Sequence, residues 1–179
     1  MAAPGRSSPY RLEINPWVMD AELTRAHVAR GAFLAGVAEL EIGLTEVAIR
    51  LSRLDEYHGL RERFPTRRKE RIRFLREACN LVGPLSQYAS ILEKVILRYE
   101  EFCTYRDLLA HARMRVLSMP HGNASIALTD YFARGEEITQ RIERASLFEL
   151  ERKARRVCSV ARAFNYLYHR VDSELPTLD

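Results

Sequence analysis

Residues 20–54 read DAELTRAHVARGAFLAGVAELEIGLTEVAIRLSRL, and this stretch decides the fold. Its apolar residues recur at steps of three and four, with a gap at Arg30, which is the period of an amphipathic α-helix. They are Leu23, Ala26, Phe33, Val37, Leu40, Leu44, Val47, Leu51 and Leu54, widened by a second line of Leu34, Ala38, Ile42 and Ile49. The stretch predicts one helix of about 35 residues, capped by Asp20, that packs against more than one neighbour.

A second, shorter helix is predicted after a break. Tyr57, His58 and Gly59 interrupt the first pattern, and residues 66–79 have the period of a helix. The residues expected to face inward are Ile72, Leu75, Cys79 and Val82.

The third and last helices have clear starting signals. Gly83-Pro84 ends the shorter helix and places a proline in the first turn of the third. Arg106 falls on the apolar stripe of that third helix, at a position where a leucine would be expected. The last helix opens at the capping box Ser146-Leu147-Phe148-Glu149 and extends to about Val171.

The period changes between the third and last helices. Residues 116–119 and 125–129 flank Pro120-His121-Gly122-Asn123, which predicts a small hairpin with a Gly/Asn turn. Residues 137–142 fit either a strand or a helix. The fold predicted is mostly all-α: a four-helix bundle with a small β-hairpin insertion before the last helix. Residues 1–19, with three prolines, are expected to form an arm, and residues 20–179 a single domain.

The composition suits a protein with reduced thiols and no membrane-spanning helix. The three cysteines, Cys79, Cys103 and Cys158, are far apart, which suits free thiols and offers no metal site. No apolar run approaches the ~18–20 residues that cross a membrane, and the first residues lack a secretory signal. We therefore expect a cytoplasmic protein. Metal-ligand spacings, a glycine-rich phosphate loop and a serine-hydrolase motif are all missing, so no cofactor is expected.

The segment Tyr105-Arg106-Asp107-Leu108-Leu109-Ala110-His111-Ala112 carries the residues best suited to chemistry. Arginine clamps phosphate bidentately, and histidine moves protons near neutral pH. Asp107 and His111 are four apart and share a helix face, whereas Arg106 and His111 differ by ~140° in azimuth. Two copies about a two-fold axis would bring both pairs into one cleft, which favours a homodimer. The other reading is that Arg106 reaches solvent or pairs with a glutamate of the first helix, and that His111 is a core histidine.

This segment resembles the HEPN superfamily (higher eukaryotes and prokaryotes nucleotide-binding domains), helical bundles marked by Arg-x4–6-His on a long helix. Arg106, Asp107 and His111 match that motif, although asparagine is commoner at the middle position. The long first helix, the hairpin and the closing helix are also similar. Many members are metal-independent endoribonucleases, often toxins of toxin–antitoxin or phage-defence systems, with a composite site at a dimer interface.

The resemblance implies a role for each motif residue. His111 would deprotonate the ribose 2′-OH, Arg106 would steady the phosphate, and Asp107 would favour a charged His111 while repelling phosphate. The partners implied are RNA, a second copy of the chain and an antitoxin protein.

A basic run precedes the motif. Residues 61–76 contain eight arginines and lysines against two glutamates. Arg67, Arg68 and Arg71 are therefore candidates for binding the RNA backbone, and the alternative is a solvated helix face. The alternative for the whole protein is a non-catalytic helical module for dimerisation or interaction that keeps the fold.

Overall fold

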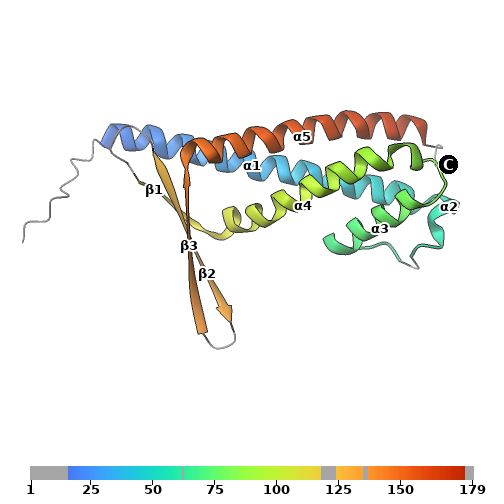
Figure 1. The fold of residues 1–179 in the computed structure, drawn as a ribbon, viewed down its shortest axis with the longest axis horizontal. Coiled ribbons are helices and arrows are strands. Elements are labelled where there is room, and N and C mark those ends of the chain that lie inside the picture. Colours follow the sequence, from blue (N-terminus) through green and yellow to red (C-terminus); the bar gives the residue numbers. More distant parts are fainter. Residues whose placement is uncertain (1–15, 62, 118–123, 135–136, 176–179) are drawn as a thin grey trace, which may run out of the picture.

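The computed structural model describes residues 16–61, 63–117, 124–134 and 137–175. The chain is mostly helical with one small three-stranded antiparallel sheet, as the sequence predicts at this level (Figure 1). Within the described residues, no helix has both the length and the apolar character needed to cross a membrane. The elements are α1 (Pro16–Leu51), α2 (Asp55–His58), α3 (Arg68–Asn80), the 3-10 turn η1 (Ser86–Tyr88), α4 (Ala89–His111), β1 (Arg113–Leu117), β2 (Ser125–Arg134), β3 (Glu137–Ser146) and α5 (Leu147–Glu174).

Helix α1 is the long helix that the opening stretch predicts, with two differences. It begins at Pro16, so Asp20 lies inside the helix and does not cap it. Proline suits this first position because its missing N–H would have no partner there. The main apolar line is buried from Ala26 to Leu51, whereas Ile42 of the second line is exposed. Leu34 of the second line is partly buried against the core.

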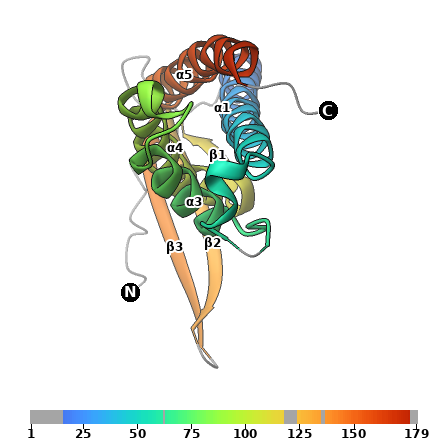
Figure 2. The ribbon, with the colours of Figure 1, turned by 90° about the vertical axis from the view of Figure 1, so that its right-hand side faces the viewer.

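Helices α1 and α5 run side by side, and two glycines let them approach closely (Figures 1 and 2). A Cβ added at Gly36 would lie 3.0 Å from Cγ1 of Val157, and one added at Gly43 would lie 2.7 Å from Cε1 of Phe164. Val157 and Phe164 are both buried in the core. Side chains of α5 therefore fill the space that these glycines leave open.

The start of α5 is the predicted capping box. The Ser146 hydroxyl accepts a hydrogen bond from the Glu149 N–H at 3.1 Å, and the Ser146 N–H donates to Oε2 of Glu149 at 3.0 Å. These two bonds satisfy backbone donors that the first turn of a helix leaves without partners.

The connection between α3 and α4 departs from the prediction. Helix α3 buries Ile72 and Leu75 as expected, but Val82 is 99% exposed because the helix ends at Asn80. Pro84 lies before η1 and not in the first turn of α4, which begins at Ala89. The buried Tyr57 fixes this connection, because its hydroxyl accepts a hydrogen bond from the Leu85 N–H at 3.2 Å.

The predicted hairpin is present and has a third strand. β1 pairs with β2, with Arg113 opposite Thr129. β2 pairs with β3 along its whole length, as far as Arg134 opposite Glu137. Residues 137–142, which fit a strand or a helix, are therefore strand. The predicted turn at residues 120–123 lies outside the described residues. Figures 1 and 2 show the β2–β3 pair projecting away from the helices.

Candidate functional site

The motif lies on the last two turns of α4, at the surface. The Arg106 side chain is 41% exposed and that of Asp107 is 49% exposed, and His111 is exposed as well. The prediction that Arg106 sits on the buried stripe is wrong. Tyr105 takes that place, with its ring 5.3 Å from the Phe33 ring in an edge-to-face contact.

Two arginines share one carboxylate beside the motif. Nη1 of Arg106 donates to Oδ1 of Asp107 at 2.9 Å, and Nη2 of Arg68 on α3 lies 3.7 Å from Oδ2. The hydrogen bond to Asp107 raises the pKa of Arg106. The cluster of Arg68, Arg106 and Asp107 carries one net positive charge, half exposed to solvent. A half-exposed cluster with this charge attracts anions.

Arg71 is held differently from the other two predicted RNA-binding arginines. Its Nη2 lies 3.2 Å from Oε1 of Glu41 on α1, and its other terminal nitrogen donates to the carbonyl of Thr66. A glutamate of the first helix therefore pairs with Arg71, whereas Arg106, the residue for which such a pair was the alternative, pairs with Asp107. Arg67 is exposed at the start of α3, directly before Arg68.

The basic run is partly neutralised by glutamates. Arg61 and Arg73 both pair with Glu77, at 2.7 and 2.9 Å. Arg76 pairs with Glu93 at 3.0 Å and with Glu100 at 2.9 Å. The positive charge that remains for a ligand is therefore concentrated at the start of α3, next to the cluster.

A small cleft of about 210 Å³ opens between α3 and α4 at this cluster. Burial raises the pKa of Tyr99 and of the Cys103 thiol, so both stay protonated at neutral pH and neither supplies a base. The residues that line the cleft are Arg68, Lys69, Ile72, Tyr99, Glu100, Cys103, Thr104 and Asp107.

His111 continues the α4 line that forms one wall of the cleft. Thr104, Asp107 and His111 follow at steps of three and four, so they share a helix face. The expected contact between Asp107 and the imidazole is not formed, because the carboxylate turns to Arg106 and Arg68. His111 is an exposed residue at the end of α4 and not a core histidine.

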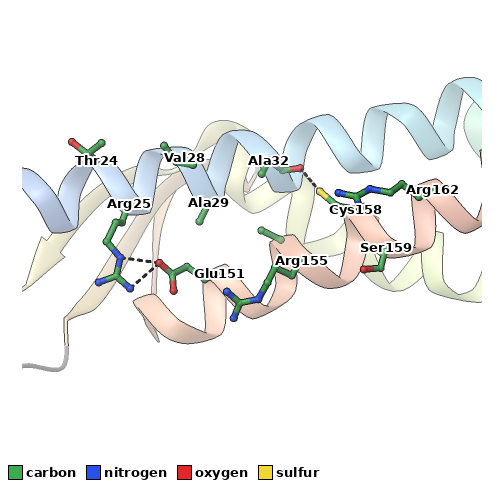
Figure 3. Close-up of a pocket in the computed structure, with 11 residues that line it drawn as sticks. Thr24, Arg25, Val28, Ala29, Ala32, Glu151, Arg155, Cys158, Ser159 and Arg162 are labelled. Atoms are coloured by element: carbon green, nitrogen blue, oxygen red, sulfur yellow. Dashed lines mark hydrogen bonds and ion pairs between the residues drawn. The ribbon is translucent and has the colours of Figure 1, made fainter.

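A larger groove of about 580 Å³ lies elsewhere, between α1 and α5 (Figure 3). Arg25 and Glu151 close one side of it with an ion pair of 2.8 Å. The thiol of Cys158 donates to the Ala32 carbonyl at 3.5 Å. Val28 is exposed on its rim. This groove holds none of the motif residues.

The motif thus contributes Arg106 and Asp107 to a charged cluster with Arg68, and one exposed histidine further along the same helix. The Arg68–Asp107 contact was not foreseen, because it depends on how α3 packs against α4. The density of basic residues in 61–76 was the only sign of it in the sequence. No protein-family model, curated protein or solved structure matches this chain.

Proposed function

We propose that this chain is a metal-independent endoribonuclease of HEPN type, a four-helix bundle that cleaves RNA as a homodimer. The observation that carries the proposal is the half-exposed cluster of Arg68, Arg106 and Asp107 beside the exposed His111. A cationic clamp and a proton carrier are the two groups that phosphodiester cleavage needs.

The reaction needs one proton removed and one supplied. His111 accepts the proton of the ribose 2′-OH, and the 2′ oxygen attacks the adjacent phosphorus. The bond from phosphorus to the 5′ oxygen then breaks, leaving a 2′,3′-cyclic phosphate and a 5′-hydroxyl. A second histidine protonates the leaving oxygen. Arg106 and Arg68 stabilise the charge on the non-bridging oxygens, once the phosphate has displaced Asp107 from them.

One copy of the chain does not supply both histidines. Arg106 and His111 also lie about 7.5 Å apart along the helix axis and differ by ~140° in azimuth. Leu97, Thr104 and His111 follow at heptad spacing on α4, and Leu97 is 54% exposed. A two-fold contact along this face would bury Leu97 and bring His111 next to its copy.

The test is the product of RNA cleavage. The purified full chain is incubated with a mixture of structured and single-stranded RNAs in EDTA. We expect fragments with 2′,3′-cyclic phosphate and 5′-hydroxyl ends, and a bell-shaped dependence of the rate on pH. Fragments with 5′-phosphate ends, or cleavage only with added divalent metal, would contradict the mechanism.

A second candidate is a non-catalytic module for interaction with a partner. The groove between α1 and α5, with the exposed Val28 on its rim, supports this alternative, as does a second hollow between the same helices that the exposed Ile42 lines. It predicts intact RNA under every condition, together with a complex that Val28→Asp disrupts.

A further inference from the structure

The strand register divides the sheet into two unlike faces. Met114 and Val116 of β1 pair with Leu128 and Ile126 of β2, and all four side chains are buried against the helices. Residues one step along point to the opposite, outer face. The outer-face residues of the described strands are Arg113, Arg115, Leu117, Ser125, Ala127, Thr129, Tyr131, Ala133, Ile138, Gln140, Ile142, Arg144 and Ser146.

Three arginines stand together on this outer face. Arg115 of β1 and Arg144 of β3 flank Ala127 in one row of the register, and Arg113 flanks Thr129 in the next. All three arginines are exposed. Because they occupy neighbouring positions of the register on one face, these three side chains make one basic patch across the three strands.

The outer face carries positive charge without compensation. The acidic residues of the described strands lie at the alternate positions and therefore belong to the inner face: Asp130, Glu137 and Glu143. Within the described part of the chain, Arg113, Arg115 and Arg144 form no ion pair, unlike Arg76 or Arg61 in the basic run. A surface of this kind is complementary to a polyanion.

An aromatic ring extends the same face beyond the arginines. Tyr131 is 62% exposed, and its hydroxyl accepts a hydrogen bond from Nε2 of Gln140 at 3.0 Å. β1 ends at the level of Thr129, so the ring stands on the two-stranded part of the sheet. An exposed aromatic on a sheet next to arginines favours unpaired bases, which can stack on it, over a duplex, whose bases are already stacked.

The chain links this face directly to the candidate catalytic histidine. His111 ends α4, the buried Ala112 follows, and Arg113 begins β1. We propose that the outer face of the sheet binds single-stranded RNA and leads it to His111. Binding by the sheet stands on its own observations, and only the delivery to His111 rests on the proposed function.

The experiment measures binding of a labelled single-stranded RNA of about 12 nucleotides, within the range of one single-strand site. The full chain carries His111→Ala so that no substrate is consumed. Each of Arg113→Ala, Arg115→Ala and Arg144→Ala is expected to reduce the salt slope by about 0.7. Tyr131→Ala is expected to weaken binding by about 5- to 150-fold with the slope unchanged. Arg141→Ala, on the inner face and paired with Glu143, is the matched control and leaves binding unaltered.

Three outcomes overturn the inference. One is a triple arginine variant that keeps the parent's affinity and salt slope. Another is a duplex of the same length that binds as tightly as the single strand. The third is that the arginine variants change the self-association of the chain in sedimentation experiments but leave RNA binding unchanged. The outer face would then be an interface between copies. Binding that depends on the sheet in a chain that never cleaves RNA would refute the proposed nuclease and leave this inference standing.

Discussion

Asp107 holds the two cationic groups to which we assign phosphate binding. Its carboxylate lies between Arg106, at 2.9 Å, and Arg68, at 3.7 Å. A phosphate has to compete with this carboxylate for both guanidinium groups. In the proposed mechanism Asp107 therefore competes with the substrate phosphate while it keeps the arginines in position.

Asp107→Asn is expected to maintain or raise RNA cleavage, because the neutral amide releases Arg68 and Arg106 to the phosphate. Stability should change by less than about 1 kcal/mol, since half-exposed ion pairs contribute little. The measurement is kcat/KM with a thermal melt. Glu101→Gln is the control, because Glu101 pairs with Arg98 on the same helix. Loss of cleavage with an unchanged melt would show that the carboxylate itself is needed.

Tyr57 makes a buried hydrogen bond that sequence patterns do not reveal. Tyr57→Phe leaves the Leu85 N–H without its partner, so we expect a loss of about 1–2 kcal/mol in the free energy of unfolding. Burial raises the pKa of Tyr57. The wild type should therefore lose stability as pH rises above the ordinary tyrosine value of about 10, and the variant should lose less. Urea unfolding at neutral and alkaline pH measures both effects, and equal curves would contradict them.

At the scale of elements, the contact between α1 and α5 depends on the glycine at position 43 but not on the one at position 31. A Cβ at Gly43 would clash with the Phe164 ring at 2.7 Å, whereas a Cβ at Gly31 meets nothing within 4 Å. Gly43→Ala should destabilise the protein by about 1–3 kcal/mol. Gly31→Ala, the control on the same helix, should stabilise it by up to about 1 kcal/mol. Thermal melts that shift in the same direction would refute this account of the packing.

Local sequence patterns predicted the helices and strands well, but they could not predict the contacts between these elements. The apolar line of α1 and the capping box at Ser146 depend on residues close in sequence, and both are confirmed. The strand at 137–146 depends on pairing with β2, so its sequence alone left it undecided. The exposure of Arg106 follows from Tyr105 taking the core-facing position next to it. The Arg-x4-His spacing can be read from the sequence, but the contact of Arg68 with the motif residue Asp107 cannot.

At the scale of the whole molecule, the charged surfaces follow one another along the chain. The cluster on α3 and α4, His111 at the end of α4, and the outer face of the sheet come in sequence order. The β2–β3 pair projects beyond the helices (Figure 2). An RNA strand lying on the sheet would therefore meet the protein at the end of the helical body where α4 stops.

The proposed homodimer uses the α4 face that carries Leu97 and His111. Leu97→Asp should shift the chain toward monomer at tens of micromolar in sedimentation experiments and reduce RNA cleavage, because it places a charge in an apolar contact. Val28→Asp, in the groove between α1 and α5, should leave the association unchanged. The reverse pattern would assign self-association to the groove and contradict a composite site on α4.

The most direct test of the nuclease compares RNA cleavage by the wild type with that by His111→Ala and Arg106→Ala, all in EDTA. We expect His111→Ala to reduce the rate by about 10²–10⁴-fold, as loss of a general base does. By analogy with oxyanion sites, Arg106→Ala should cost about 10²–10³-fold. His169→Ala on α5 and Arg98→Ala on α4 serve as controls that keep the wild-type rate. Wild-type protein that leaves every RNA intact with or without metal, or a His111→Ala variant as active as the wild type, would contradict the account.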